Sequence, residues 1–166
     1  MIRFNHYLTE AFDSSYKFTG KKVAKDEYSY GFDSEFTDAD GKTKRSRVEV
    51  EIFGSENADD YYICDIGFSR KTMGRGGFGL SSYGETGEGD ALKIFSTVMK
   101  IAQDFVKKED PKYVSFSAEK PKGSNPKILA TREKLYLRMA KKYFGNKFNI
   151  TVKSNGQTSI FYLDRK

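Results

Sequence analysis

Alternating apolar and polar positions predict three antiparallel strands in the first half of the chain. Aromatic residues alternate with polar ones across Tyr28–Phe36, and aliphatic residues alternate with charged ones across Arg45–Phe53. Because side chains of a strand point to opposite faces in turn, each segment predicts one buried face. The turn Asp38–Gly41 joins them into a hairpin, and Tyr61–Phe68 predicts the third strand. The preceding segment, Lys17–Lys25, is interpreted as a polar connection.

The apolar spacing changes to that of a helix in three places. Phe4, Leu8 and Phe12 are four residues apart, which predicts a short N-terminal helix within residues 1–13. A broad apolar face from Leu92 to Val106 predicts a long helix, for which Asp90 is a suitable N-cap. The segment Pro126–Phe144 predicts another long helix, because proline suits the first helical turn.

Short strands are predicted after each of the two long helices. Tyr113–Ala118 lies between the helices, and Phe148–Val152 and Thr158–Leu163 form a terminal hairpin around Asn155-Gly156. A further strand is predicted near Phe78–Tyr83, inside a glycine-rich segment.

This order predicts one domain over residues 1–166, of the α+β or mixed α/β class. We expect a central, mostly antiparallel sheet with one parallel crossover and helices on both faces. Its parts are the helix in 1–13, antiparallel strands in 27–68, a loop–helix–strand–helix unit in 84–144, and the hairpin in 148–164.

Composition excludes several classes of protein. Apolar residues make up 37% of the 166 residues and aromatic residues 15%, which argues against disorder. No apolar run approaches the roughly 20 residues of a membrane span, and Met1–Asp13 has no uninterrupted apolar core of a signal peptide. A single cysteine, Cys64, and a single histidine, His6, predict neither a disulfide framework nor a metal site. We therefore expect a protein of a reducing compartment, the cytoplasm, with no membrane partner.

Charge is distributed unevenly along the chain. Residues 1–99 contain 13 basic and 17 acidic side chains, whereas residues 100–166 contain 16 and 6, a net charge of +10. Two interpretations stay open: the basic half binds an anionic partner such as nucleic acid or a polyphosphate cofactor, or its lysines only solvate helix surfaces. Ser117 and Arg132 belong to the basic region around the start of the second long helix.

The segment that enters the first long helix is a candidate anion site. It contains Gly84, Gly87 and Gly89 and ends at Asp90. Glycines before a helix let backbone N–H groups converge, and the helix start adds a positive partial charge. The alternative is a flexible connector that Asp90 caps, and glycine spacing alone does not decide between them.

Two motifs in this order of elements resemble the GNAT N-acetyltransferase superfamily. Gly84-Glu-Thr-Gly87-Glu-Gly89 resembles the later glycines of that family's cofactor turn, and Leu135-Tyr136-Leu137-Arg138 resembles the first half of its last-helix motif. The resemblance implies a GNAT-like fold and acetyl-CoA as cofactor, held by residues 84, 87, 89 and 90 with Ser117 and Arg132. It implies Tyr136 as the general acid for the departing thiolate and Asp65 as a base that deprotonates the acceptor amine.

The start of the chain, Phe4–Phe12, is similar to the openings of small tailed-phage proteins, as is Gly87-Glu-Gly-Asp-Ala91. This resemblance implies a location in the host cytoplasm or the virion. We therefore carry two hypotheses: an N-acetyltransferase acting on an amine-bearing protein or small molecule, and a catalytically inactive phage module. The inactive module would bind nucleic acid, or a phage or host protein, through the basic C-terminal half.

Overall fold

The fold is known from a computed structural model, which describes residues 14–37, 40–56, 62–74, 77–81, 91–119, 126–155 and 158–166. The predicted helix within residues 1–13 lies outside the described residues. The strands are β1 (Thr19–Ala24), β2 (Glu27–Thr37), β3 (Thr43–Glu56), β4 (Tyr62–Gly74), β5 (Gly77–Ser81), β6 (Tyr113–Glu119), β7 (Phe148–Asn155) and β8 (Thr158–Arg165). The two described helices are α2 (Ala91–Glu109) and α3 (Pro126–Phe144).

The strands form one sheet in the order β1-β2-β3-β4-β6-β8-β7, and β5 pairs with the end of β4. Neighbouring strands are antiparallel except for β4 and β6, which run parallel over four register pairs. The predicted β2–β3 hairpin is confirmed, with Tyr30 opposite Val50 and Phe32 opposite Val48. Gly41 has a φ of 76° in the turn between these strands, a conformation that glycine adopts without steric cost.

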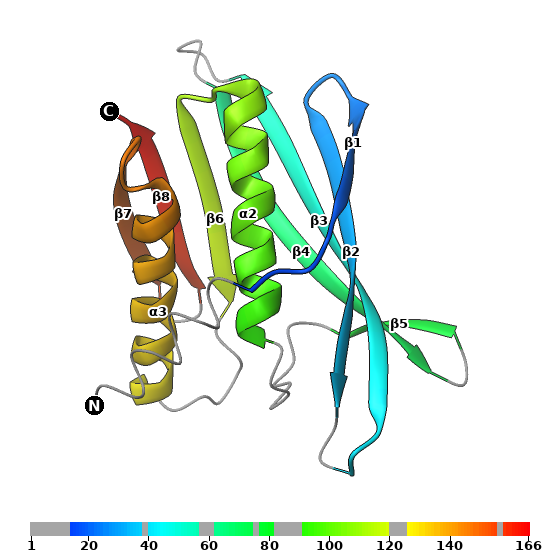
Figure 1. The fold of residues 1–166 in the computed structure, drawn as a ribbon. Coiled ribbons are helices and arrows are strands. Elements are labelled where there is room, and N and C mark those ends of the chain that lie inside the picture. Colours follow the sequence, from blue (N-terminus) through cyan, green and yellow to red (C-terminus); the bar gives the residue numbers. More distant parts are fainter. Residues whose placement is uncertain are drawn as a thin grey trace.

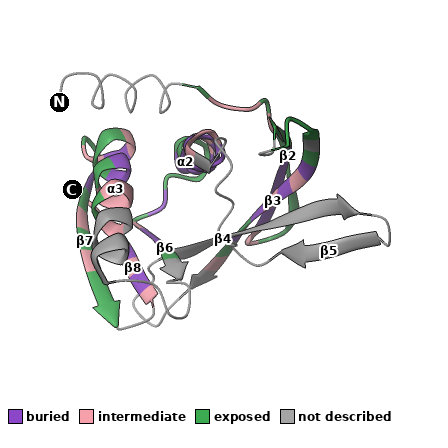
Figure 2. Cartoon of the chain, turned by 90° about the horizontal axis from the view of Figure 1, so that it is seen from below, coloured by how far each residue is buried: buried purple, intermediate pink, exposed green. Residues whose placement is uncertain are grey.

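The predicted fold class is wrong in the placement of its helices. Figure 2 shows α2 and α3 on the same face of the curved sheet, whereas a GNAT-like sheet with helices on both faces was expected. Strands also dominate the described structure, with eight strands against two helices. The sequence pattern identified the apolar stripe of each helix, but a stripe does not specify which face of a sheet it will cover.

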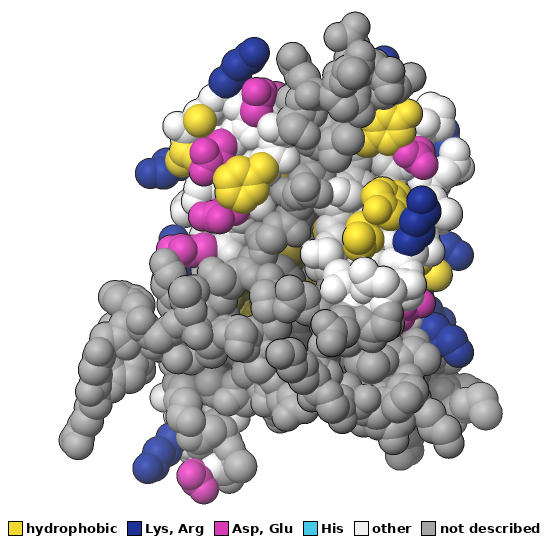
Figure 3. All heavy atoms as spheres, turned by 180° about the vertical axis from the view of Figure 1, so that it is seen from behind, with side chains coloured by type: hydrophobic (Ala, Val, Ile, Leu, Met, Phe, Trp, Pro, Cys, Tyr) yellow, Lys and Arg dark blue, Asp and Glu magenta, His cyan; other side chains and the backbone are white. Residues whose placement is uncertain are grey.

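The core lies between this face of the sheet and the two helices. Tyr28, Tyr30 and Phe32 of β2 and Val48, Val50 and Ile52 of β3 are buried, at 0–6% exposure. They pack together with the apolar face of α2, from Ile94 to Val106, and with Met139 and Ala140 of α3. The opposite face of the sheet carries hydrophobic, basic and acidic side chains side by side (Figure 3).

Strand β1 was expected to be a polar connection. It pairs with β2 at the edge of the sheet, with Lys22 opposite Tyr28. All six of its residues are exposed. Because neither face of the strand is buried, its sequence does not alternate between apolar and polar residues. Backbone hydrogen bonding to β2, which sequence patterns do not report, gives it its strand conformation.

Candidate functional site at the β4–β6 fork

The two parallel strands β4 and β6 separate after only four register pairs. The pairing runs from Ile63 with Tyr113 to Ile66 with Phe116. Beyond it, residues 67–69 of β4 pair with β3 only, and residues 117–119 of β6 pair with β8 only, in the part of the chain that the structure describes. We call these two backbone segments the β4–β6 fork.

The fork lies at the end of the sheet where α2 begins. In Figure 1, β4 and β6 run side by side at the upper end and separate toward the lower end, close to the start of α2. Both strands contribute their carboxyl ends here, because they are parallel and the connecting helix returns antiparallel to them. In open sheets with parallel strands, the crevice at the carboxyl ends is where ligands commonly bind.

The first turn of α2 contains one cation, Lys93, and no acidic residue. Asp90, the expected N-cap, directly precedes it in the sequence. The Lys93 ammonium lies 4.1 Å from the centroid of the Tyr16 ring. A cation in the first turn opposes the helix dipole at a cost of a few tenths of a kcal/mol, up to ~1 kcal/mol. Lys93 therefore places a positive charge near the start of α2 without stabilising the helix.

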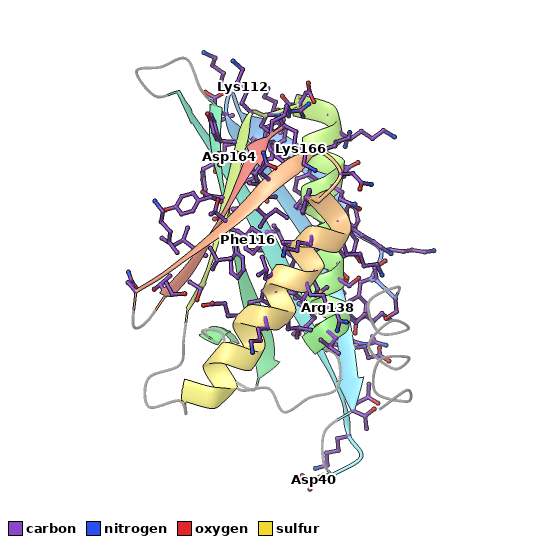
Figure 4. The ribbon with its side chains drawn as sticks, turned by 90° about the vertical axis from the view of Figure 1, so that its left-hand side faces the viewer. Asp40, Lys112, Phe116, Arg138, Asp164 and Lys166 are labelled. Carbon is purple, nitrogen blue, oxygen red and sulfur yellow. The ribbon has the colours of Figure 1, made fainter. Side chains whose placement is uncertain are left out.

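A chain of aromatic rings leads from the fork to Tyr136. Phe116, at the last β4–β6 register pair, is stacked on Phe161 with centroids 4.7 Å apart. The Tyr136 ring meets Phe161 edge-on at 6.4 Å and is stacked on Phe95 of α2 at 4.3 Å. Figure 4 labels Phe116, which belongs to β6. Tyr136 is thus held by rings from α2 and β8, one ring away from the residue where the strands part.

A carboxylate that the sequence analysis did not single out lies one helical turn from Tyr136. Glu133 Oε2 accepts hydrogen bonds from the Ser154 and Ser159 hydroxyls, both at 2.5 Å. The two hydroxyls are 3.0 Å apart, and Ser159 pairs in register with Ala118 of the fork. Glu133 and Tyr136 are three positions apart, so both belong to one side of α3. The spacing of three positions from Tyr136 was the only sequence signal that could have identified Glu133 as a site residue.

Residue 65, the predicted base, belongs to the part of β4 that pairs with β6. Residue 65 pairs in register with Phe53 and Ser115. The flanking positions pair with Val114 and Phe116, which are buried in the core.

The other predicted cofactor residues fall into two groups. Gly84, Gly87, Gly89 and Asp90 lie outside the described residues. Ser117 is exposed and is the first residue of β6 beyond the β4–β6 pairing. Residue 132 belongs to α3, one turn before Tyr136 and on the side of the helix start. The backbone of these last two positions is therefore at the fork end of the molecule.

No family model and no curated protein matches the chain. Neither α2 nor α3 has an apolar stretch sufficient to span a membrane. Within the described ranges, no three His, Cys, Asp or Glu side chains gather as a metal site would require.

Proposed function

We propose that the protein is an acyl-CoA-dependent N-acetyltransferase that holds its thioester cofactor at the β4–β6 fork. The observation that supports this proposal is the separation of β4 and β6 after Ile66 and Phe116. A cytoplasmic location is part of the same proposal, since the single thiol of Cys64 forms no intrachain disulfide.

The donor groups at the fork suit this cofactor. Residues 67–69 and 117–119 have backbone edges that no described strand occupies on the side of the fork. Backbone N–H and C=O groups need hydrogen-bond partners, and the amide-containing arm of coenzyme A is an extended chain that can supply them as an added strand does. Lys93 in the first turn of α2 supplies a positive charge for the diphosphate at the helix start.

The chemistry that an acyl-CoA supplies is an activated acyl carbon for transfer to an amine. Tyr136 would donate its phenolic proton to the departing sulfur, as the amide C–N bond forms and the C–S bond breaks. The proton released by the amine would pass to solvent water or to the Glu133 carboxylate, the only acidic group of α3. Stacking on Phe95 would hold the phenol in one orientation during this transfer.

A catalytically inactive binding module is the second candidate function. The observation that favours it is that Glu133 Oε2 already accepts hydrogen bonds from the Ser154 and Ser159 hydroxyls, which occupies the carboxylate nearest to Tyr136 along α3. Such a module would bind at the fork without releasing free thiol. The two candidates therefore differ in turnover, and binding alone does not distinguish them.

The decisive experiment uses the first turn of α2. Ala91→Glu places a carboxylate at the helix start, where it should leave the melting temperature unchanged or slightly higher. The same charge should weaken acetyl-CoA binding at least 10-fold in isothermal titration calorimetry. Ala91→Gln, of similar size and no charge, is the matched control and should bind as the wild type does.

Three outcomes would decide the proposal. Micromolar binding that only the glutamate variant loses, together with thiol release in the presence of amines, supports the enzyme. The same binding without thiol release from any amine supports the inactive module. No heat up to millimolar acetyl-CoA would contradict binding at the fork.

A further inference from the structure

The exposed side of α3 carries a row of cations. Lys134, Arg138 and Lys141 are exposed side chains of this helix. We call this surface the α3 cationic face. Figure 4 shows Arg138 on α3, the helix nearest the viewer. Residues 134, 138 and 141 are three or four positions apart and therefore lie along one side of the helix, about one cation per 5.4 Å turn.

The opposite side of α3 fixes the orientation of this row. Met139 and Ala140 are fully buried and Phe144 is 3% exposed, so these positions face the core. Glu133, the only acidic residue of α3, is held by Ser154 and Ser159 of the terminal hairpin. The carboxylate therefore does not interrupt the row.

The three cations of this row have no acidic partner in the part of the chain that the structure describes. Lys134, Arg138 and Lys141 form no ion pair with any acidic side chain among the described residues. The outer face of β2 and β3 differs, because there Arg45 pairs with Glu35 and Arg47 pairs with Asp33. The three α3 cations therefore differ from Arg45 and Arg47, whose charges are paired.

From this arrangement we propose that the α3 cationic face binds the phosphate backbone of double-stranded nucleic acid. Unpaired cations at regular spacing release counterions from a polyanion, and this release supplies most of the affinity of binding that does not read sequence. Single strands are bound mainly by aromatic rings on which bases stack. The aromatic residue beside the row, Tyr143, is half-buried and its hydroxyl is 2.9 Å from the Ser96 hydroxyl. The face thus offers charge without a stacking platform, which favours a duplex.

The test compares two triple variants with the same change in net charge. K134E/R138E/K141E reverses the row, and K17E/K21E/K25E reverses three exposed lysines in and beside β1, at the far edge of the sheet. Fluorescence anisotropy with a labelled 20-base-pair duplex is measured from 50 to 200 mM NaCl. For three phosphate contacts, wild-type affinity should fall about 40-fold over this range.

We expect the α3 variant to lose at least 10-fold in affinity at 50 mM NaCl and to show a flatter salt dependence. The β1 variant should stay within about threefold of the wild type, and circular dichroism should show both folded. Equal losses in the two variants, affinity independent of salt, or tighter binding of a single-stranded 20-mer would each overturn the proposal. It does not depend on acyl transfer, since the fork is not altered in either variant.

Discussion

The ring of Tyr136 lies parallel to the ring of Phe95, with their centroids 4.3 Å apart and their planes 19° from each other. This contact joins α3 to α2. The ring of Phe161 in β8 meets the Tyr136 ring edge-on, with the two centroids 6.4 Å apart. Tyr136 is therefore a packing residue as well as a candidate acid. The two roles rest on different atoms, because the ring makes the stack and the hydroxyl would carry the proton.

Substitutions at Tyr136 should separate these two roles. Tyr136→Phe retains the ring and should change the free energy of unfolding by at most about 1 kcal/mol, the usual contribution of one hydrogen bond. It should nevertheless lower thiol release from acetyl-CoA at least 10-fold if the hydroxyl is the acid. Tyr136→Ala removes the stack and should cost about 3 kcal/mol in urea unfolding. Full turnover in the phenylalanine variant would remove Tyr136 from the chemistry.

Two strand glycines provide a test of packing at the sheet edge. A Cβ atom at Gly20 would lie 2.1 Å from Cδ1 of Tyr30, whose buried ring cannot move away without disturbing the core. A Cβ atom at Gly31 would meet the Arg47 guanidinium at 2.5 Å, the flexible end of a side chain that is 41% exposed. We expect Gly20→Ala to destabilise the protein by roughly 1–3 kcal/mol and Gly31→Ala by much less. Urea unfolding measures both, and equal losses would contradict this account.

The pKa of Tyr30 should make stability fall at alkaline pH. Burial, and secondarily the negative charge of Asp104, raises the pKa of Tyr30 to about 12. In the unfolded chain this phenol ionises near pH 10, so between pH 10 and 12 the folded state binds more protons than the unfolded state. Folding stability should therefore fall as pH rises through this window, by roughly 1.4 kcal/mol per pH unit from this group.

The matched control for this pH effect is Tyr30→Phe, which removes the titrating hydroxyl and keeps the ring. Its free energy of unfolding, measured in urea from pH 8 to pH 11, should fall less steeply above pH 10 than that of the wild type. Parallel curves for the two proteins would show that Tyr30 does not titrate differently on folding.

Most secondary structure was predictable because it depends on local periodicity. Alternation across Tyr28–Phe36 and Arg45–Phe53 gave strands that pair in the structure, and the apolar face after Asp90 gave α2. The terminal hairpin was marked by Asn155-Gly156, and Asn155 Oδ1 accepts a hydrogen bond from the Thr158 N–H. Strand β1 was missed because its exposed residues have no apolar side to reveal it.

The candidate site was less predictable, because its members come from distant parts of the chain. The sequence singled out Tyr136 through a resemblance, but not Glu133, whose partners Ser154 and Ser159 are more than 20 residues away. The same resemblance implied Asp65 as a base, and the structure places the backbone of residue 65 in the β4–β6 pairing. Which distant segments lie beside one another depends on packing across the whole sheet, which local periodicity does not report.

The sequence by itself determined most of the helices and strands, though not β1, and which side of most of them is apolar, since these follow from neighbours three, four or two residues apart. Its charge pattern also determined that the last third of the chain is basic. Only the tertiary structure decided that α2 and α3 cover one face of the sheet and that β4 and β6 part after four pairs. Both are outcomes of packing between segments far apart in the chain, where many weak contacts are optimised together and no single residue carries the information.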